Sequence, residues 1–208
     1  DTKVVNRGAA DKLFINTAGI GEIPAGIDSF GGNARPGDAV VVSGTLGDHG
    51  AAIMVAREQL GLSSTLESDC APLGGLVAEM LAVCPDIRVL RDPTRGGAAT
   101  ALNEIAMQSR LGIEIDEETI PVKPAVRGIC EILGLDPMYL ANEGKLIALV
   151  PDGEAGAVLK AMQRHSYGKD AAIIGRTLPQ TPGRLVMRTP YGSRRILDMM
   201  VSDPLPRI

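Results

Sequence analysis

The sequence predicts an α/β (α+β) fold in which helices pack on a mixed β-sheet. Apolar runs typical of strands alternate with segments of helical period along most of the chain. Residues 39–43 (AVVVS) are apolar without alternation, as in a strand that is covered on both faces. Three strand-like runs follow one another at residues 171–175, 184–189 and 194–199, and consecutive strands can pair antiparallel. A purely parallel, doubly wound sheet is therefore not expected.

Caps, glycines and prolines set the expected bounds of the other elements. We expect helices over residues 51–60, 72–83, 98–109, 124–133 and 154–165. We expect further strands over residues 88–90, 112–115 and 145–150. Residues 62–69 show no regular pattern between two expected helices, and we expect them to be mobile.

Three segments are expected along the chain. Residues 1–17 read as strand, turn and strand, and residues 19–36 are rich in Gly and Pro, as in a linker. Because two strands cannot bury a core, residues 1–36 are interpreted as the remnant of an N-terminal domain and its linker. The C-terminal α/β domain is expected over residues 37–201. Prolines keep the tail, residues 202–208, extended.

Composition excludes several classes of function. The net charge is −4 and aromatic residues make up 2% of the chain, which argues against a nucleic-acid-binding protein. No apolar run reaches the length of a membrane span, and no signal peptide is recognisable. Cys70, Cys84 and Cys130 are scattered, which favours buried, reduced thiols in a cytoplasmic protein over a zinc site or disulfides.

Two glycine-rich turns each separate a predicted strand from a predicted helix. In residues 44–50, free backbone N–H groups can hold an anion, although such a turn also needs glycine and a capping Asp48 for structural reasons. In residues 91–97, Asp92 can hold Mg²⁺ and Arg95 can steer a phosphate. The alternative is that Asp92 or Thr94 only caps the helix and that Arg95 pairs with a surface acid.

A third turn, residues 141–145 (ANEGK), precedes an apolar strand. An acid, Glu143, and a base, Lys145, flank a glycine there, which suits a catalytic turn, but an exposed hairpin turn has the same composition. Lys3 lies in a Val-rich strand, where a solvated edge lysine is the ordinary interpretation.

Taken together, these segments resemble the HypE family of hydrogenase maturation factors. Each string is weak alone, but all occur in the family's order over essentially the whole chain. The matching strings are DTKVV (1–5), RGAAD (7–11), INTAGIG (15–21), SGTLGDHG (43–50), REQLGL (57–62), DPTRGG (92–97), PVKPAVRG (121–128), ANEGKL (141–146), GKDAAIIG (168–175) and PLPRI (204–208).

The resemblance implies both a fold and a reaction. The family belongs to the superfamily of aminoimidazole ribonucleotide synthetase and selenophosphate synthetase, with an N-terminal domain that dimerises, a C-terminal α/β domain and ATP bound between them. HypE-like proteins use ATP and Mg²⁺ to dehydrate an S-carboxamide on their C-terminal cysteine to a thiocyanate. The product supplies cyanide for the iron of [NiFe]-hydrogenase. The implied partners are HypF, the HypC–HypD complex and a second copy in a homodimer, in the cytoplasm, without nucleic acid or membrane.

The resemblance also implies roles for particular residues. Lys3 and Glu143 are the catalytic candidates, Glu143 as general base and Lys3 as the cation that stabilises the phosphorylated intermediate. The other candidates are, for ATP, Asp1, Thr2, Thr94, Arg95 and Asn142, and for the metal ion, Asp92 and Asp1.

Two departures from the family pattern limit what the sequence as given is expected to do. Family members end in PRIC, whereas this sequence ends at Ile208, and they have a long segment before the DTKVV string. We therefore expect a C-terminal fragment that is inactive and binds ATP weakly on its own. The alternatives are another ATP-dependent synthetase of the superfamily, or a maturation scaffold without catalytic activity.

Overall fold

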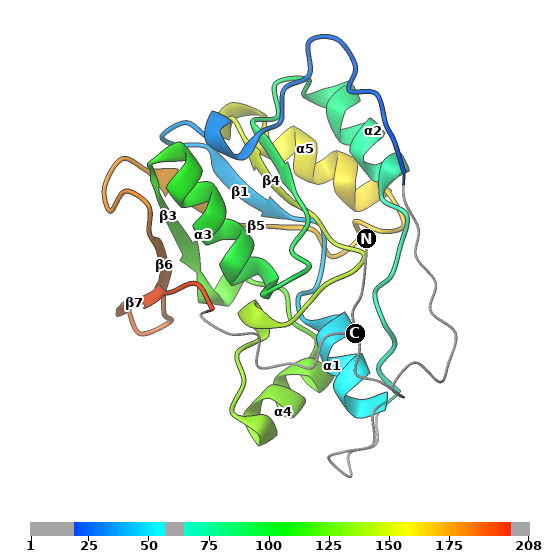
Figure 1. Cartoon of the computed structure of the whole chain (residues 1–208), viewed down its shortest axis with the longest axis vertical. Helices are drawn as coiled ribbons and strands as arrows, with labels where there is room; N and C mark the ends of the chain where they lie inside the picture. Colours follow the sequence, from blue (N-terminus) through cyan, green and yellow to red (C-terminus); the bar gives the residue numbers. More distant parts are fainter. Residues whose placement is uncertain (1–18, 57–64, 201–208) are drawn as a thin grey trace, which may run out of the picture.

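The computed structural model describes residues 19–56 and 65–200. The strands expected within residues 1–17 and the tail at residues 202–208 lie outside these ranges. Within them, Figure 1 shows one central sheet with helices on both sides.

The sheet has seven strands in the described residues, in the order β2-β4-β1-β5-β3-β6-β7. The pair β3 and β6 is parallel, and every other neighbouring pair is antiparallel. The predicted mixed sheet is confirmed. The strands are β1 (Ala39–Val42), β2 (Val89–Arg91), β3 (Gly112–Asp116), β4 (Ile147–Val150), β5 (Ala172–Leu178), β6 (Leu185–Arg188) and β7 (Arg194–Leu197).

Helices cover both faces of this sheet (Figure 1). Helix α3 packs on one face, α2 and α5 pack on the other, and α1 and α4 pack against each other at one end. The described helices are α1 (Asp48–Ala56), α2 (Gly74–Val83), α3 (Gly97–Ser109), α4 (Pro124–Leu133) and α5 (Asp152–Arg164).

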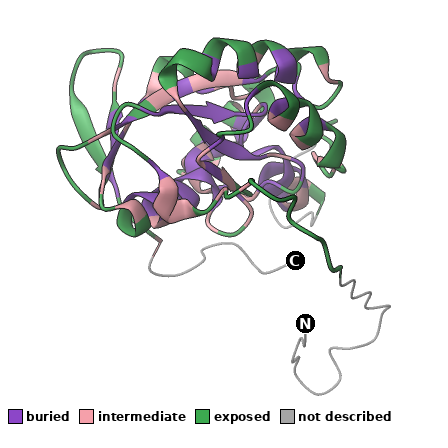
Figure 2. Cartoon of the chain, turned by 90° about the horizontal axis from the view of Figure 1, so that it is seen from above, coloured by how far each residue is buried: buried purple, intermediate pink, exposed green. Residues whose placement is uncertain are grey.

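The side chains of strand β1 are buried on both faces of the sheet, as expected. Val40 and Val42 join the cluster under α3, whereas Val41 joins the cluster under α2 and α5. All three are fully buried, because successive side chains of a strand point to opposite faces. The buried strands enclosed by helices with exposed outer faces are visible in Figure 2. The continuous apolar run thus forms an inner strand, as predicted.

The structure corrects the expected pairing of the last three strands. Strands β6 and β7 form an antiparallel hairpin, but β3 lies between β5 and β6. Strand β3 is largely buried and therefore takes an inner position, while most of β7 is exposed at the edge. Strand β5 also continues to Leu178, beyond the expected end at residue 175.

Most helix bounds agree with the expectation, and α4 matches it at both ends. Helix α1 begins three residues earlier than expected, at Asp48, whose acid is favourable in a first helical turn. Its expected end at residue 60 lies outside the described residues. No helix in the described ranges combines the length and apolarity that a membrane crossing requires.

The start of α3 depends on a glycine. Gly97 has φ +65°, and a Cβ added there would lie 2.4 Å from the carbonyl oxygen of Met138. We expect Gly97→Ala to lower the free energy of unfolding by about 3 kcal/mol, because it combines backbone strain with a clash against backbone. Gly128→Ala is the control, since Gly128 lies inside α4 with open space around its Cβ position and should gain up to about 1 kcal/mol. Urea denaturation followed by circular dichroism measures both, and equal effects would contradict the argument.

Candidate active site

The three glycine-rich turns of the sequence meet at one edge of the sheet. Strands β1 and β2 both run antiparallel to β4, which lies between them. The ends of β1 and β2 and the start of β4 therefore share one edge. The turns at residues 43–50, 92–97 and 141–146 occupy that edge, so chain-distant segments are placed side by side.

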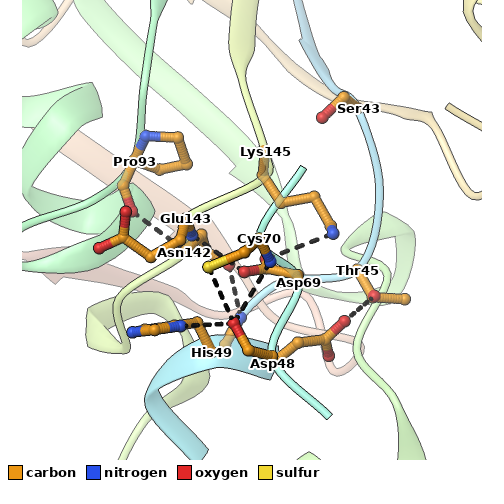
Figure 3. A network of polar contacts seen from close by, with 12 residues as sticks. Ser43, Thr45, Asp48, His49, Asp69, Cys70, Pro93, Asn142, Glu143 and Lys145 are labelled. Carbon is orange, nitrogen blue, oxygen red and sulfur yellow. Dashed lines mark hydrogen bonds and ion pairs between the residues drawn. The ribbon is translucent and has the colours of Figure 1, made fainter. Parts of the chain in front are cut away.

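Asn142 joins these turns through its buried side chain (Figure 3). Its Oδ1 accepts a hydrogen bond from the backbone N–H of Gly47 at 2.8 Å. Its Nδ2 donates to the carbonyl oxygens of Pro93 at 3.1 Å and Leu140 at 3.0 Å. The side chain is 1% exposed and is engaged at both ends. The geometry therefore gives Asn142 the role of holding the turns together, and its contact with ATP stays a prediction.

Glu143 follows directly and is exposed at this edge. Its backbone N–H donates to Oδ1 of Asp69 at 2.9 Å. At the next position, a Cβ on Gly144 would lie 1.7 Å from the carbonyl oxygen of Asp69, so that only glycine fits. The backbone is therefore fixed at Asn142 before Glu143 and at Gly144 after it, and the Glu143 carboxyl group projects from this fixed turn.

Lys145 and Asp69 form an ion pair behind this turn (Figure 3). Lys145 Nζ lies 3.3 Å from Asp69 Oδ2, and the side chains are 12% and 2% exposed. The stem of Lys145 also covers Gly44 of the first turn. From the sequence, Glu143 and Lys145 were predicted to act as the acid and the base of a catalytic turn. In the structure, Lys145 instead forms an ion pair with Asp69.

Asp92 lies on the neighbouring turn with an accessible carboxylate. Its side chain is 63% exposed, accepts a hydrogen bond from Thr94 Oγ1 at 2.7 Å and lies 3.3 Å from a guanidinium nitrogen of Arg91. The N-cap of α3 is Gly96, and no side chain caps this helix. The alternative that Asp92 or Thr94 merely caps the helix is therefore wrong.

Arg95 is exposed and has no ion pair within the described part of the chain, so the alternative of a surface salt bridge finds no support there. No group of three or more His, Cys, Asp or Glu side chains in residues 19–56 and 65–200 is arranged to hold a metal ion. Asp1, Thr2 and Lys3 lie outside the described residues, and their predicted roles stay predictions.

The first turn leads into the start of α1, where Asp48 and His49 are buried. Asp48 Oδ2 accepts from Thr45 Oγ1 at 2.6 Å and lies 2.8 Å from Lys123 Nζ. His49 Nδ1 lies 2.7 Å from Ser68 Oγ. These contacts make Asp48 and His49 internal anchors of the turn.

Asp69 is the residue that sequence reasoning missed. Residues 62–69 were expected to be mobile, but Ser68 and Asp69 make side-chain contacts to two of the turns. No local pattern marks Asp69, because its partners lie far away in the chain. The indirect signal is Gly144, whose missing side chain leaves room for the Asp69 backbone.

The cysteine prediction is partly corrected. Cys84 and Cys130 are buried as expected, but Cys70 is exposed beside Ser68. Burial raises the pKa of the Cys84 thiol, and burial followed by the nearby Asp136 raises the pKa of Cys130 to about 11.

These thiols should differ in reactivity. The thiolate is the reactive form, and at about pH 8 only about a thousandth of Cys130 is ionised. We expect iodoacetamide to label Cys70 at that pH while the folded protein leaves Cys84 and Cys130 unmodified. Mass spectrometry of peptides measures the labelling, and denatured protein serves as the control in which all three react. Faster labelling of Cys130 than of Cys70 would contradict the burial.

The hydrogen bonds of Asn142 predict a large stability effect. Asn142→Ala leaves the buried N–H of Gly47 without its partner, and we expect it to lower the free energy of unfolding by about 3 kcal/mol. The control is Asn33→Ala, which removes one exposed hydrogen bond to Asp28 and should change stability by less than about 0.5 kcal/mol. Urea denaturation compares the two, and a loss for Asn142→Ala as small as that of the control would refute the role.

The fold is that of an AIR synthase related protein. The chain belongs to that family, whose C-terminal domain matches residues 35–188. It is 52% identical to carbamoyl dehydratase HypE of Rhodobacter capsulatus over all 208 residues, and it spans 61% of that relative's length. The resemblance to the HypE family that the sequence motifs predicted is confirmed.

Solved structures of HypE proteins agree with this result. The crystal structure of E. coli HypE matches with a TM-score of 0.90 at 51% identity, covering 99% of this chain and 63% of that one. HypE in complex with ATP matches with a TM-score of 0.80 at 43% identity, covering 85% and 54%. A HypE–HypF complex matches with a TM-score of 0.78 at 46% identity, covering 82% and 55%.

Proposed function

We propose that this chain is the C-terminal part of an ATP-dependent carbamoyl dehydratase. The reaction converts a cysteine S-carboxamide to a thiocyanate, and ATP becomes ADP and phosphate, so that the amide oxygen leaves on phosphate. The product supplies cyanide for the iron of [NiFe]-hydrogenase. Because the chain spans about three fifths of its curated relatives, the activity belongs to a protein that also contains their N-terminal part.

One observation carries this proposal: the turn with Glu143 and the turn with Asp92 lie side by side at one edge of the sheet. The backbone N–H and the side chain of Asn142 both donate to the carbonyl oxygen of Pro93, the residue after Asp92. This contact between their neighbours supports a common site for the candidate base and the candidate metal ligand. Had these turns been on opposite sides of the domain, the proposed chemistry would be impossible.

In the proposed mechanism, the amide oxygen receives the γ-phosphoryl group of ATP and ADP leaves. Glu143 then accepts one of the two protons of the amide nitrogen, and the second proton leaves with phosphate as the C–O bond breaks and the C≡N bond forms. Lys3 stabilises the negative charge on the phosphorylated oxygen. Arg95 and Thr94 bind phosphate at the start of α3, where no side chain caps the helix and the helix N-terminus attracts anions.

Asp92 fits Mg²⁺ because its carboxylate is exposed at this edge and hard cations prefer carboxylate and phosphate oxygens. Asp1 would be a second ligand. When bound, the metal ion neutralises charge on the phosphates of ATP. This assignment and those of Thr2 and Asn142 to ATP are supported by the family's motifs.

The relatives also suggest partners. A HypE protein has been solved with ATP and another with HypF, which supports ATP as cosubstrate and HypF as the source of the carbamoyl group. The HypC–HypD complex, a homodimer and a location in the cytoplasm are parts of the same proposal.

The base is tested by Glu143→Gln in an extended chain, in which residues 1–208 follow the N-terminal part of E. coli HypE and precede a C-terminal cysteine. We expect dehydration of the carbamoylated cysteine to slow by at least about a hundredfold, because glutamine cannot accept the proton. Mass spectrometry follows the ATP-dependent loss of one water from the C-terminal peptide.

The matched control is Glu79→Gln, which changes an exposed acid on α2 and should leave the rate unchanged. Wild-type turnover by Glu143→Gln would remove Glu143 from the mechanism. Absence of dehydration by the unaltered extended chain, together with intact binding to HypF, would favour the alternative of a scaffold.

A further inference from the structure

Asp69 is a buried carboxylate to which the mechanism above gives no part. Its side chain is 2% exposed, and both of its oxygens face the turn at residues 141–145. Oδ1 accepts from the backbone N–H of Glu143 at 2.9 Å, and Oδ2 lies 3.3 Å from Lys145 Nζ. One interaction therefore reaches the proposed base, Glu143, and the other reaches Lys145, two residues further along the chain.

Burying such a group is costly, and stability alone does not explain it. A carboxylate removed from water loses hydration that an ion pair seldom restores in full. Here the ion pair lacks hydrogen-bond geometry, since Oδ2 has no hydrogen-bond partner among the residues that the structure describes. The hydrogen bond that Asp69 does complete is the one to Glu143, which indicates that holding this backbone is its principal effect.

The segment around Asp69 is itself fixed. Ser68 Oγ lies 2.7 Å from Nδ1 of His49, a residue that is 5% exposed at the start of α1. On the other side, the backbone of Asp69 fills the space where a side chain at Gly144 would stand. Figure 3 shows Asp69 beside Glu143 and Lys145, its two partners in the turn.

The Glu143 turn is thus held at three successive residues. Asn142 is bound to the neighbouring turns, Glu143 to the carboxylate of Asp69, and Gly144 packs against the Asp69 backbone. Within the described part of the chain, the side-chain hydrogen bond that acts on the residue with the proposed base is the one from Asp69. Removing it frees the peptide plane between Asn142 and Glu143, where rotation of the backbone moves the Glu143 carboxyl group.

We propose that Asp69 is a positioning residue that fixes the backbone of Glu143 so that its carboxylate meets the amide nitrogen of the substrate. This inference rests on the proposed function of Glu143. A displacement of about 1 Å at a reacting group costs about a hundredfold in rate, so the effect should fall on the chemical step and leave substrate binding intact.

The test compares Asp69→Ala with Asp69→Asn in the extended chain described above. Asp69→Ala removes the acceptor for the Glu143 N–H, and we expect kcat for dehydration to fall about a hundredfold with KM for ATP changed less than about threefold. Asp69→Asn keeps an oxygen that can accept from the Glu143 N–H, although it replaces the other oxygen with an NH2 group and loses the ion pair with Lys145, so kcat should recover to within about fivefold of wild type. Asp86→Ala, which removes an exposed acid paired with Arg88, is the control and should leave both constants unchanged.

A second measurement does not depend on the reaction. Hydrogen exchange followed by mass spectrometry should show faster exchange at the Glu143 amide in Asp69→Ala and wild-type exchange in Asp69→Asn. Unchanged kcat in Asp69→Ala, or equal loss of kcat in both variants, would overturn the inference. If Glu143→Gln proves active, the base assignment fails instead, and the exchange data still decide whether Asp69 holds the turn.

Discussion

The hydrogen bonding of one buried amide holds together the three turns where strands β1 and β2 end and β4 begins, which is where the candidate site lies. Asn142 offers an acceptor to one turn and donors to another, and thereby unites segments that lie about fifty and about a hundred residues away. No apolar side chain could replace it, because the groups it satisfies are buried backbone N–H and C=O groups. The placement of the surrounding charged residues depends on this network, since each of them sits on a turn that it anchors.

Three consecutive residues of this turn have different structural roles. Asn142 and Gly144 are buried and shape the backbone, whereas Glu143 between them is exposed. The chain bends at Glu143 and Gly144, so the Glu143 side chain faces solvent while its two neighbours are buried. A base on such a segment keeps its direction without burying its own carboxyl group.

The sequence predicted the sheet and its helices well because local signals sufficed. The apolar run of β1 and the proline and glycine that bound α4 are readable without knowing the fold. The position of β3 between β5 and β6 was not predictable in this way, because it depends on which strands must be buried together. Asp69 was missed for the same reason. Its role depends on contacts with Glu143 and Lys145, which are distant in the sequence, so no local sequence pattern indicates them.

The strand order also has a consequence for synthesis on the ribosome. Strand β1 is made well before its two neighbours in the sheet, β4 and β5, which are residues 147–150 and 172–178. Until those segments emerge, a fully apolar strand has neither a hydrogen-bonding partner nor a completed layer of helices. Strands that pair over such long sequence distances fold slowly, and their unpaired backbone groups and apolar side chains stay exposed in the meantime. Chaperones can therefore bind the nascent chain during this period.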